Sequence, residues 1–148
     1  MRTHYLFSFF TFFFSVVLSQ TFNVKPYLQN VTPTSIHIMW ETTSGDESIV
    51  TWGESDELGD STLGEAQTGQ GNYRIHDVHL TELSPNIRYY YKTITDSLVS
   101  DIYDFITPDS PLNESSLRLI AMSDMQKDWS NPSKFEEIVH EGIIAYLE

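Results

Sequence analysis

Residues 36–40 read Ile-His-Ile-Met-Trp, and this stretch decides the fold. Its first, third and fifth residues are large and apolar, and they alternate with His37 and Met39. Alternation with a period of two is typical of a half-buried β-strand. Turn residues lie on both sides, Pro33-Thr34-Ser35 before the stretch and Ser44-Gly45-Asp46 after it. The sequence therefore predicts a strand between two turns.

Similar short stretches recur along the chain, separated by turn residues. We expect further strands over residues 24–28, 49–53, 74–80, 88–95 and 100–107. The polar, glycine-bearing residues 55–70 are expected to form a loop with one short edge strand. Seven short strands at this spacing, with no helix-period segment among them, predict an all-β immunoglobulin-like sandwich.

A corner sequence lies between the predicted strands 74–80 and 88–95. It reads Leu83-Ser84-Pro85-Asn86-Ile87-Arg88-Tyr89, with a tyrosine four residues after a proline. In sandwiches of this class, a tyrosine at the start of a late strand hydrogen-bonds through its hydroxyl to the corner backbone. We predict that Tyr89 does so and that its role is stability.

The N-terminal segment has the character of a secretory signal peptide. The run from Tyr5 to Leu18 is apolar and short, and Arg2 precedes it. Ser19 suits cleavage before Gln20, so residues 1–19 are expected to be removed on export. The alternative is a retained membrane anchor. The prediction is a secreted, periplasmic or cell-surface protein with no stable membrane insertion after cleavage.

Charge and cysteine content exclude several function classes. The 148 residues carry 21 acidic and 8 basic side chains, a net charge of −13, whereas nucleic-acid binding requires clustered Lys and Arg. We therefore expect no nucleic-acid partner. The absence of cysteine excludes disulfides, thiolate zinc sites, iron–sulfur clusters and a cysteine nucleophile.

A different architecture is expected after residue 108. Residues 109–116 form a linker rich in Pro, Asn, Ser and acids, and the apolar run of residues 117–122 suits a strand covered on both faces. A helix comes next, capped by Ser130 or Asn131, with apolar side chains on one face at helical spacing. The sequence thus predicts the first strand, loop and helix of an α/β domain within residues 117–148.

The chemistry is expected in the loop after this strand. Ligand sites of α/β sheets lie beyond the carboxyl ends of the strands, where Asp124 is placed to bind a hard cation. Gln126 and Asp128 lie near it in sequence. The alternative is a helix-capping or solvated loop acid. His76 and His79, three apart on a strand, are expected to point to opposite faces and not to bind one ion.

The first part of the chain resembles a fibronectin type III domain and, more closely, the N-terminal domain of purple acid phosphatases. The resemblance covers residues 24–108, within a domain that we assign to residues 22–108, and implies a non-catalytic sandwich beside an enzyme domain. It rests on Pro26-Tyr27-Leu28-Gln29, Ile38-Met39-Trp40, Ile49-Val50-Thr51-Trp52-Gly53, His76-Asp77-Val78-His79-Leu80-Thr81-Glu82-Leu83-Ser84-Pro85, Tyr89-Tyr90-Tyr91 and Phe105-Ile106-Thr107-Pro108.

The loop sequence Ser123-Asp124-Met125-Gln126 is similar to the first motif of calcineurin-like metallophosphoesterases. That motif is Gly-Asp-x-His, or Gly-Asp-x-Gly in purple acid phosphatases, so Ser123 replaces the glycine and Gln126 the fourth residue. The resemblance implies that Asp124 is a metal ligand, with Gln126 and Asp128 near the site. It further implies an acid phosphatase that cleaves phosphate monoesters with a metal pair, iron with iron, zinc or manganese.

The family's later metal-binding motifs, with a bridging Asp, an Asn-His pair and terminal histidines, do not occur before Glu148. We therefore expect residues 117–148 to be a truncated start of the metallophosphoesterase domain and the 148-residue chain itself to be inactive. Two alternatives stay open: an exported, non-catalytic fibronectin III-like binding module, and a shortened product with no independent role.

Overall fold

The computed structural model describes residues 19–113, 130 and 133–144. The chain divides into two compact units, residues 1–113 and residues 114–148, and each is described by itself. The predicted strand at 117–122 and the loop that carries Asp124, Gln126 and Asp128 lie outside the described residues.

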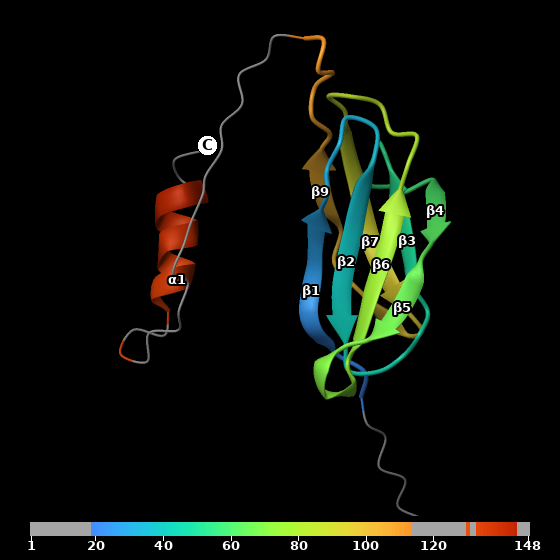
Figure 1. Ribbon diagram of the computed structural model, residues 1–148, viewed down its shortest axis with the longest axis vertical. Helices are drawn as coiled ribbons and strands as arrows, with labels where there is room; N and C mark the ends of the chain where they lie inside the picture. The colour runs from blue at the N-terminus through green and yellow to red at the C-terminus, as the bar shows by residue number, and fades with distance from the viewer. Residues whose placement is uncertain (1–18, 114–129, 131–132, 145–148) are drawn as a thin grey trace, which may run out of the picture. The chain divides into compact units, whose positions relative to one another are not determined.

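The first unit is a sandwich of two antiparallel sheets (Figure 1). The first sheet has the order β1-β2-β6-β5, and in the second sheet β4-β3-β7 is extended by β8 and β9, which both pair with β7. The strands are β1 (Phe22–Gln29), β2 (Ile36–Thr42), β3 (Ile49–Gly53), β4 (Asp60–Leu63), β5 (Glu65–Thr68), β6 (Arg74–Leu80), β7 (Arg88–Thr95), β8 (Leu98–Val99) and β9 (Tyr103–Ile106). A short 3₁₀ turn, η1 (Gln70–Asn72), precedes β6.

The core lies between the two sheets and is built from alternate residues of their strands. Trp40 and Val78 face inward from the first sheet, Val50 and Tyr91 from the second, and Leu83 adds to the core from the corner. The remaining buried apolar residues are Ile36, Ile38, Leu80, Tyr89 and Phe105. The predicted sandwich is thus confirmed, and so is the alternation predicted for residues 36–40 in β2.

The prediction for residues 55–70 was wrong in one respect. The segment forms two strands, β4 and β5, which belong to different sheets. Together with the two-residue strand β8, which was also not predicted, they bring the described sandwich to nine strands instead of seven. Gly64 is the residue between them, where the chain crosses from one sheet to the other. A Cβ atom at Gly64 would lie 2.0 Å from the carbonyl oxygen of Asp77, so only glycine fits this crossing.

The second unit contains the predicted helix. It begins with the α-helical turn α1 (Lys134–Glu137) and continues with the wider turns of a π-helix, η2 (Ile138–Ile144). The spacing predicts α-helical geometry throughout. Four of the seven residues of η2 are β-branched and one is glycine, and β-branched side chains are crowded against the preceding turn of an α-helix. No helix of the described part of the chain is long and apolar enough to cross a membrane.

Candidate functional site

The predicted metal ligand Asp124 and its neighbours Gln126 and Asp128 lie outside the described residues, so this prediction stays a prediction. Within residues 19–113, 130 and 133–144, no three His, Cys, Asp or Glu side chains are grouped so that they could hold a metal ion.

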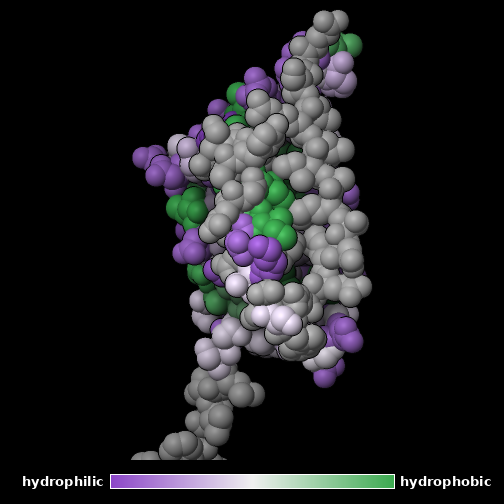
Figure 2. Space-filling model, turned by 90° about the vertical axis from the view of Figure 1, so that its left-hand side faces the viewer, coloured by the Kyte–Doolittle hydropathy of each residue, from purple (hydrophilic) through white to green (hydrophobic). Residues whose placement is uncertain are grey.

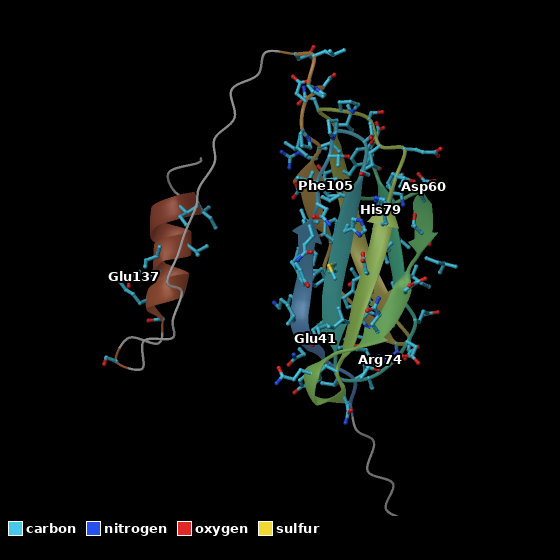
Figure 3. The ribbon with its side chains drawn as sticks, viewed as in Figure 1. Glu41, Asp60, Arg74, His79, Phe105 and Glu137 are labelled. Carbon is cyan, nitrogen blue, oxygen red and sulfur yellow. The ribbon has the colours of Figure 1, made fainter. Side chains whose placement is uncertain are left out.

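His76 and His79 lie on opposite faces of β6, as the spacing predicts. Figure 3 shows His79 toward one end of this strand and Arg74 toward the other. The His76 side chain is fully buried between the sheets, whereas His79 is exposed. The two rings therefore cannot bind one ion, and each has its own surroundings.

The buried His76 ring is held by two hydroxyl groups. Its Nε2 lies 2.8 Å from Oγ1 of Thr42, and its Nδ1 lies 2.8 Å from Oγ of Ser48. The Thr42 hydroxyl donates to the carbonyl of Ser44 at 2.8 Å, so it accepts the proton of Nε2–H. Nδ1 then accepts from Ser48. The neutral ring is fully hydrogen-bonded, and it stacks on Trp40 with ring centroids 4.8 Å apart.

Burial lowers the pKa of His76 from 6.5 to about 4. The charge of Arg74 contributes to this lowering of the pKa, while Asp46 and Asp96 act in the opposite direction. Arg74 in turn forms an ion pair with Asp46 at 2.6 Å. His76 is therefore a neutral structural group at neutral pH, tying β6 to the end of β2 and to the β2–β3 loop.

A second polar cluster lies on the outer face of the first sheet. The His37 and His79 rings stack with centroids 4.1 Å apart, and Nδ1 of His37 lies 2.8 Å from Oδ1 of Asp77. Asp77 and His79 also line a hollow of about 260 Å³. Glu65 lies directly opposite Asp77 in the strand pairing, so two carboxylates are neighbours there. The cluster is open to solvent and forms no metal centre.

The corner before β7 has the tyrosine hydrogen bond predicted from the sequence, and Thr107 adds two more that were not predicted. The backbone N–H of Ser84 donates to the phenol oxygen of Tyr89 at 2.9 Å. The Thr107 hydroxyl donates to the carbonyl of Ser84 at 2.6 Å and accepts from the N–H of Ile87 at 3.1 Å. Burial raises the pKa of Tyr91, the next inward tyrosine of β7, so that its phenol stays neutral. These contacts fix the point where the chain leaves the sandwich.

The fold and the contacts define a class of protein, a fibronectin III-like β-sandwich in which the buried His76 and the corner tyrosine hydrogen-bond within the domain. The comparison with family models gives a more particular result. The model for the purple acid phosphatase N-terminal domain matches residues 21–107, and the chain belongs to this family.

Two solved structures illustrate the similarity. The purple acid phosphatase PPD1 from yellow lupin (Lupinus luteus) seeds is 24% identical, with a TM-score of 0.47 over 61% of this chain and 20% of that chain. The chain thus corresponds to a fifth of the lupin phosphatase. The sensor domain of the anti-sigma factor RsgI4 of Pseudobacteroides cellulosolvens is 15% identical, with a TM-score of 0.49 over 66% of this chain and 100% of that chain. The search of curated proteins found no match.

Proposed function

We propose that the chain is the N-terminal part of a secreted, metal-dependent acid phosphatase. The observation that supports this proposal most is the family match at residues 21–107, together with the apolar run at residues 117–122 that Ser123-Asp124 follows. The sandwich is the non-catalytic part, and residues 117–148 begin the phosphatase domain. Export depends on the apolar N-terminal segment, which is removed before Gln20.

Asp124 is the residue that would hold a metal ion. Its carboxylate is a hard oxygen ligand, and Gln126 offers a neutral amide oxygen two residues later. When bound, a metal pair supplies a nucleophilic water and neutralises charge on the phosphoryl oxygens. One carboxylate and one amide do not fit a two-metal site by themselves, so the 148-residue chain is expected to be inactive alone.

The sandwich gives the 109–116 linker a rigid point of attachment. The hydrogen bonds of Thr107 and Tyr89 hold the end of β9 and the corner before β7 together, next to the start of this linker. This arrangement supports a structural role for the sandwich in a phosphatase, because none of its described polar clusters resembles a hydrolytic site.

The test is the activity of the protein encoded by the complete gene, purified after export and assayed with p-nitrophenyl phosphate. Asp124→Asn should lower kcat at least about a hundredfold, because the ligand loses its charge. Asp109→Asn, a matched change in the linker, should leave kcat within twofold. Equal activity of the two variants would overturn the assignment of Asp124.

The second candidate is an exported binding module. The structure of the sandwich favours this candidate, because the domain has its own closed core and a buried histidine whose ring is fully hydrogen-bonded. A stable exported sandwich without phosphatase activity or bound metal in the complete product would support the module and exclude the enzyme.

A further inference from the structure

The outer face of the second sheet carries a continuous apolar row across four strands. Leu63 of β4 pairs with Ile49 of β3, Ile49 with Ile94 of β7, and Ile94 with Val99 of β8. Residues directly opposite in antiparallel strands share a face. Thr93 and Thr95, on either side of Ile94, are fully buried, so Ile94 and its row lie on the solvent side.

The ends of the row are strongly exposed. Leu63 is 74% exposed and Val99 is 50% exposed, while Ile49 and Ile94 are half-buried between them. Figure 2 looks at the molecule from the left-hand side of Figure 1, not onto this row, and shows hydrophobic residues among hydrophilic ones there as well. Single exposed apolar residues are ordinary, but a row across adjacent strands is typical of an interaction surface.

The charges of this face differ from those of the rest of the acidic chain. Asp104 is the one carboxylate among the outward residues of the second sheet's described strands, and Arg88 forms an ion pair with it. Lys92 therefore carries the remaining charge of that face. The outer face of the first sheet, by contrast, carries Glu41, Glu65 and Asp77. Two copies of a chain with a net charge of −13 therefore repel each other least when the outer faces of their second sheets face each other.

The charges around the row are also arranged for self-association. Lys92 lies two residues before Ile94 on β7, and Asp96 lies two residues after it, in the turn beyond the end of the strand. Glu47 is on the Asp96 side too, since its carboxylate accepts the N–H of Asp96 at 3.0 Å. If the two-fold axis of the dimer lies along the row, the strands of the second copy run in the opposite direction to those of the first. The side of the row with Lys92 in each copy then faces the side with Asp96 and Glu47 in the other copy.

We propose that the row Leu63–Ile49–Ile94–Val99 is a dimerisation surface, whose occupant is the same row of a second copy of this chain. The contact is isologous, with the sheets packed face to face as in other sheet pairs. Because the row is short and the net charge is repulsive, the dimer is weak. Salt strengthens it by screening the repulsion between the two acidic chains.

The experiment is sedimentation velocity of the purified exported protein across a range of concentrations at low and high salt. We expect a monomer–dimer equilibrium that salt shifts toward the dimer. Val99→Glu and Leu63→Glu should each weaken dimerisation by about tenfold or more, because each buries an unpaired carboxylate in the contact. Both positions are exposed in the monomer, so the variants should fold normally.

Matched controls lie on β1 of the first sheet. Val24 is 42% exposed, so Val24→Glu adds the same charge outside the row and should leave the dimer within twofold. Lys92→Glu should weaken the dimer about fivefold, because charges at a contact set the pairing. Lys25→Glu, which changes the net charge equally, should weaken it far less.

Three results would overturn the proposal. The first is a monomer at all concentrations and salt conditions. The second is a dimer that responds equally to Val99→Glu and Val24→Glu. The third is a dimer lost only in Ile138→Glu, because Ile138 lies on the helix of the second unit and is 46% exposed.

Discussion

The Nε2 atom of His76 lies 2.8 Å from Oγ1 of Thr42, and this contact joins two neighbouring strands inside the sandwich. On its other side, the ring is bound by Ser48 from the β2–β3 loop. The imidazole is therefore both buried and fully hydrogen-bonded in its neutral form. Its protonation must work against the fold, and the domain's stability should depend on pH for this reason.

The first prediction concerns stability in acid. The unfolded chain takes up the histidine proton near pH 6.5, but folded His76 does so only near pH 4. Between these values the unfolded state binds more protons, so the free energy of unfolding falls as the pH falls. The loss is absent above pH 6.5 and complete below pH 4, and it amounts to about 3 kcal/mol.

Chemical denaturation at pH 7, 5.5 and 4 measures this effect. His76→Gln keeps a hydrogen-bonding side chain without a titrating ring, so its stability should vary less with pH than that of the parent protein. The comparison variant is His79→Gln, which removes an exposed imidazole from the same strand and leaves the His76 hydrogen bonds intact. An unchanged pH dependence in His76→Gln would show that other groups cause the loss.

The second prediction concerns the corner. Tyr89→Phe removes the acceptor of the Ser84 N–H and should lower the free energy of unfolding by about 1–2 kcal/mol. Tyr90→Phe is the control, because Tyr90 lies on the outer face of the same strand and its hydroxyl makes no hydrogen bond to the described residues. Thermal or urea unfolding should show a clear loss for Tyr89→Phe alone, and equal losses would argue against the corner hydrogen bond.

The third prediction concerns the crossing between the sheets. Gly64→Ala would place a Cβ atom 2.0 Å from a backbone oxygen of Asp77, and backbone cannot move aside cheaply. We expect a loss of about 2 kcal/mol or more. At Gly59, an added Cβ would meet nothing within 4 Å, so Gly59→Ala should be nearly neutral. The two urea midpoints compare these positions directly, and a stable Gly64→Ala variant would contradict this close approach.

The sequence predicted the parts of the fold that depend on alternation. Trp40, Val78 and Tyr91 lie inward, as their periodicity indicates, and the Tyr89 hydroxyl contacts the corner backbone. The sequence did not predict β4 and β5 as two strands, because they read Asp-Ser-Thr-Leu and Glu-Ala-Gln-Thr and show little apolar alternation. Their pairing with different sheets depends on the close approach at Gly64, which no local pattern shows.

The candidate site was predictable only in part. Strand periodicity separates His76 from His79, but it does not reveal that Ser48, from a loop 28 residues away, completes the His76 cluster. The apolar row on the second sheet was also missed. Leu63, Ile49, Ile94 and Val99 come from four strands and become neighbours only through the register of the sheet.

The measurement that tests the central proposal most directly is the metal content of the complete gene product, purified after export and analysed by elemental mass spectrometry. We expect about two metal ions per polypeptide, with iron among them, and a clear loss of metal in Asp124→Asn but not in Asp109→Asn. A folded, exported protein without bound metal would contradict the phosphatase assignment and leave the sandwich as a binding module.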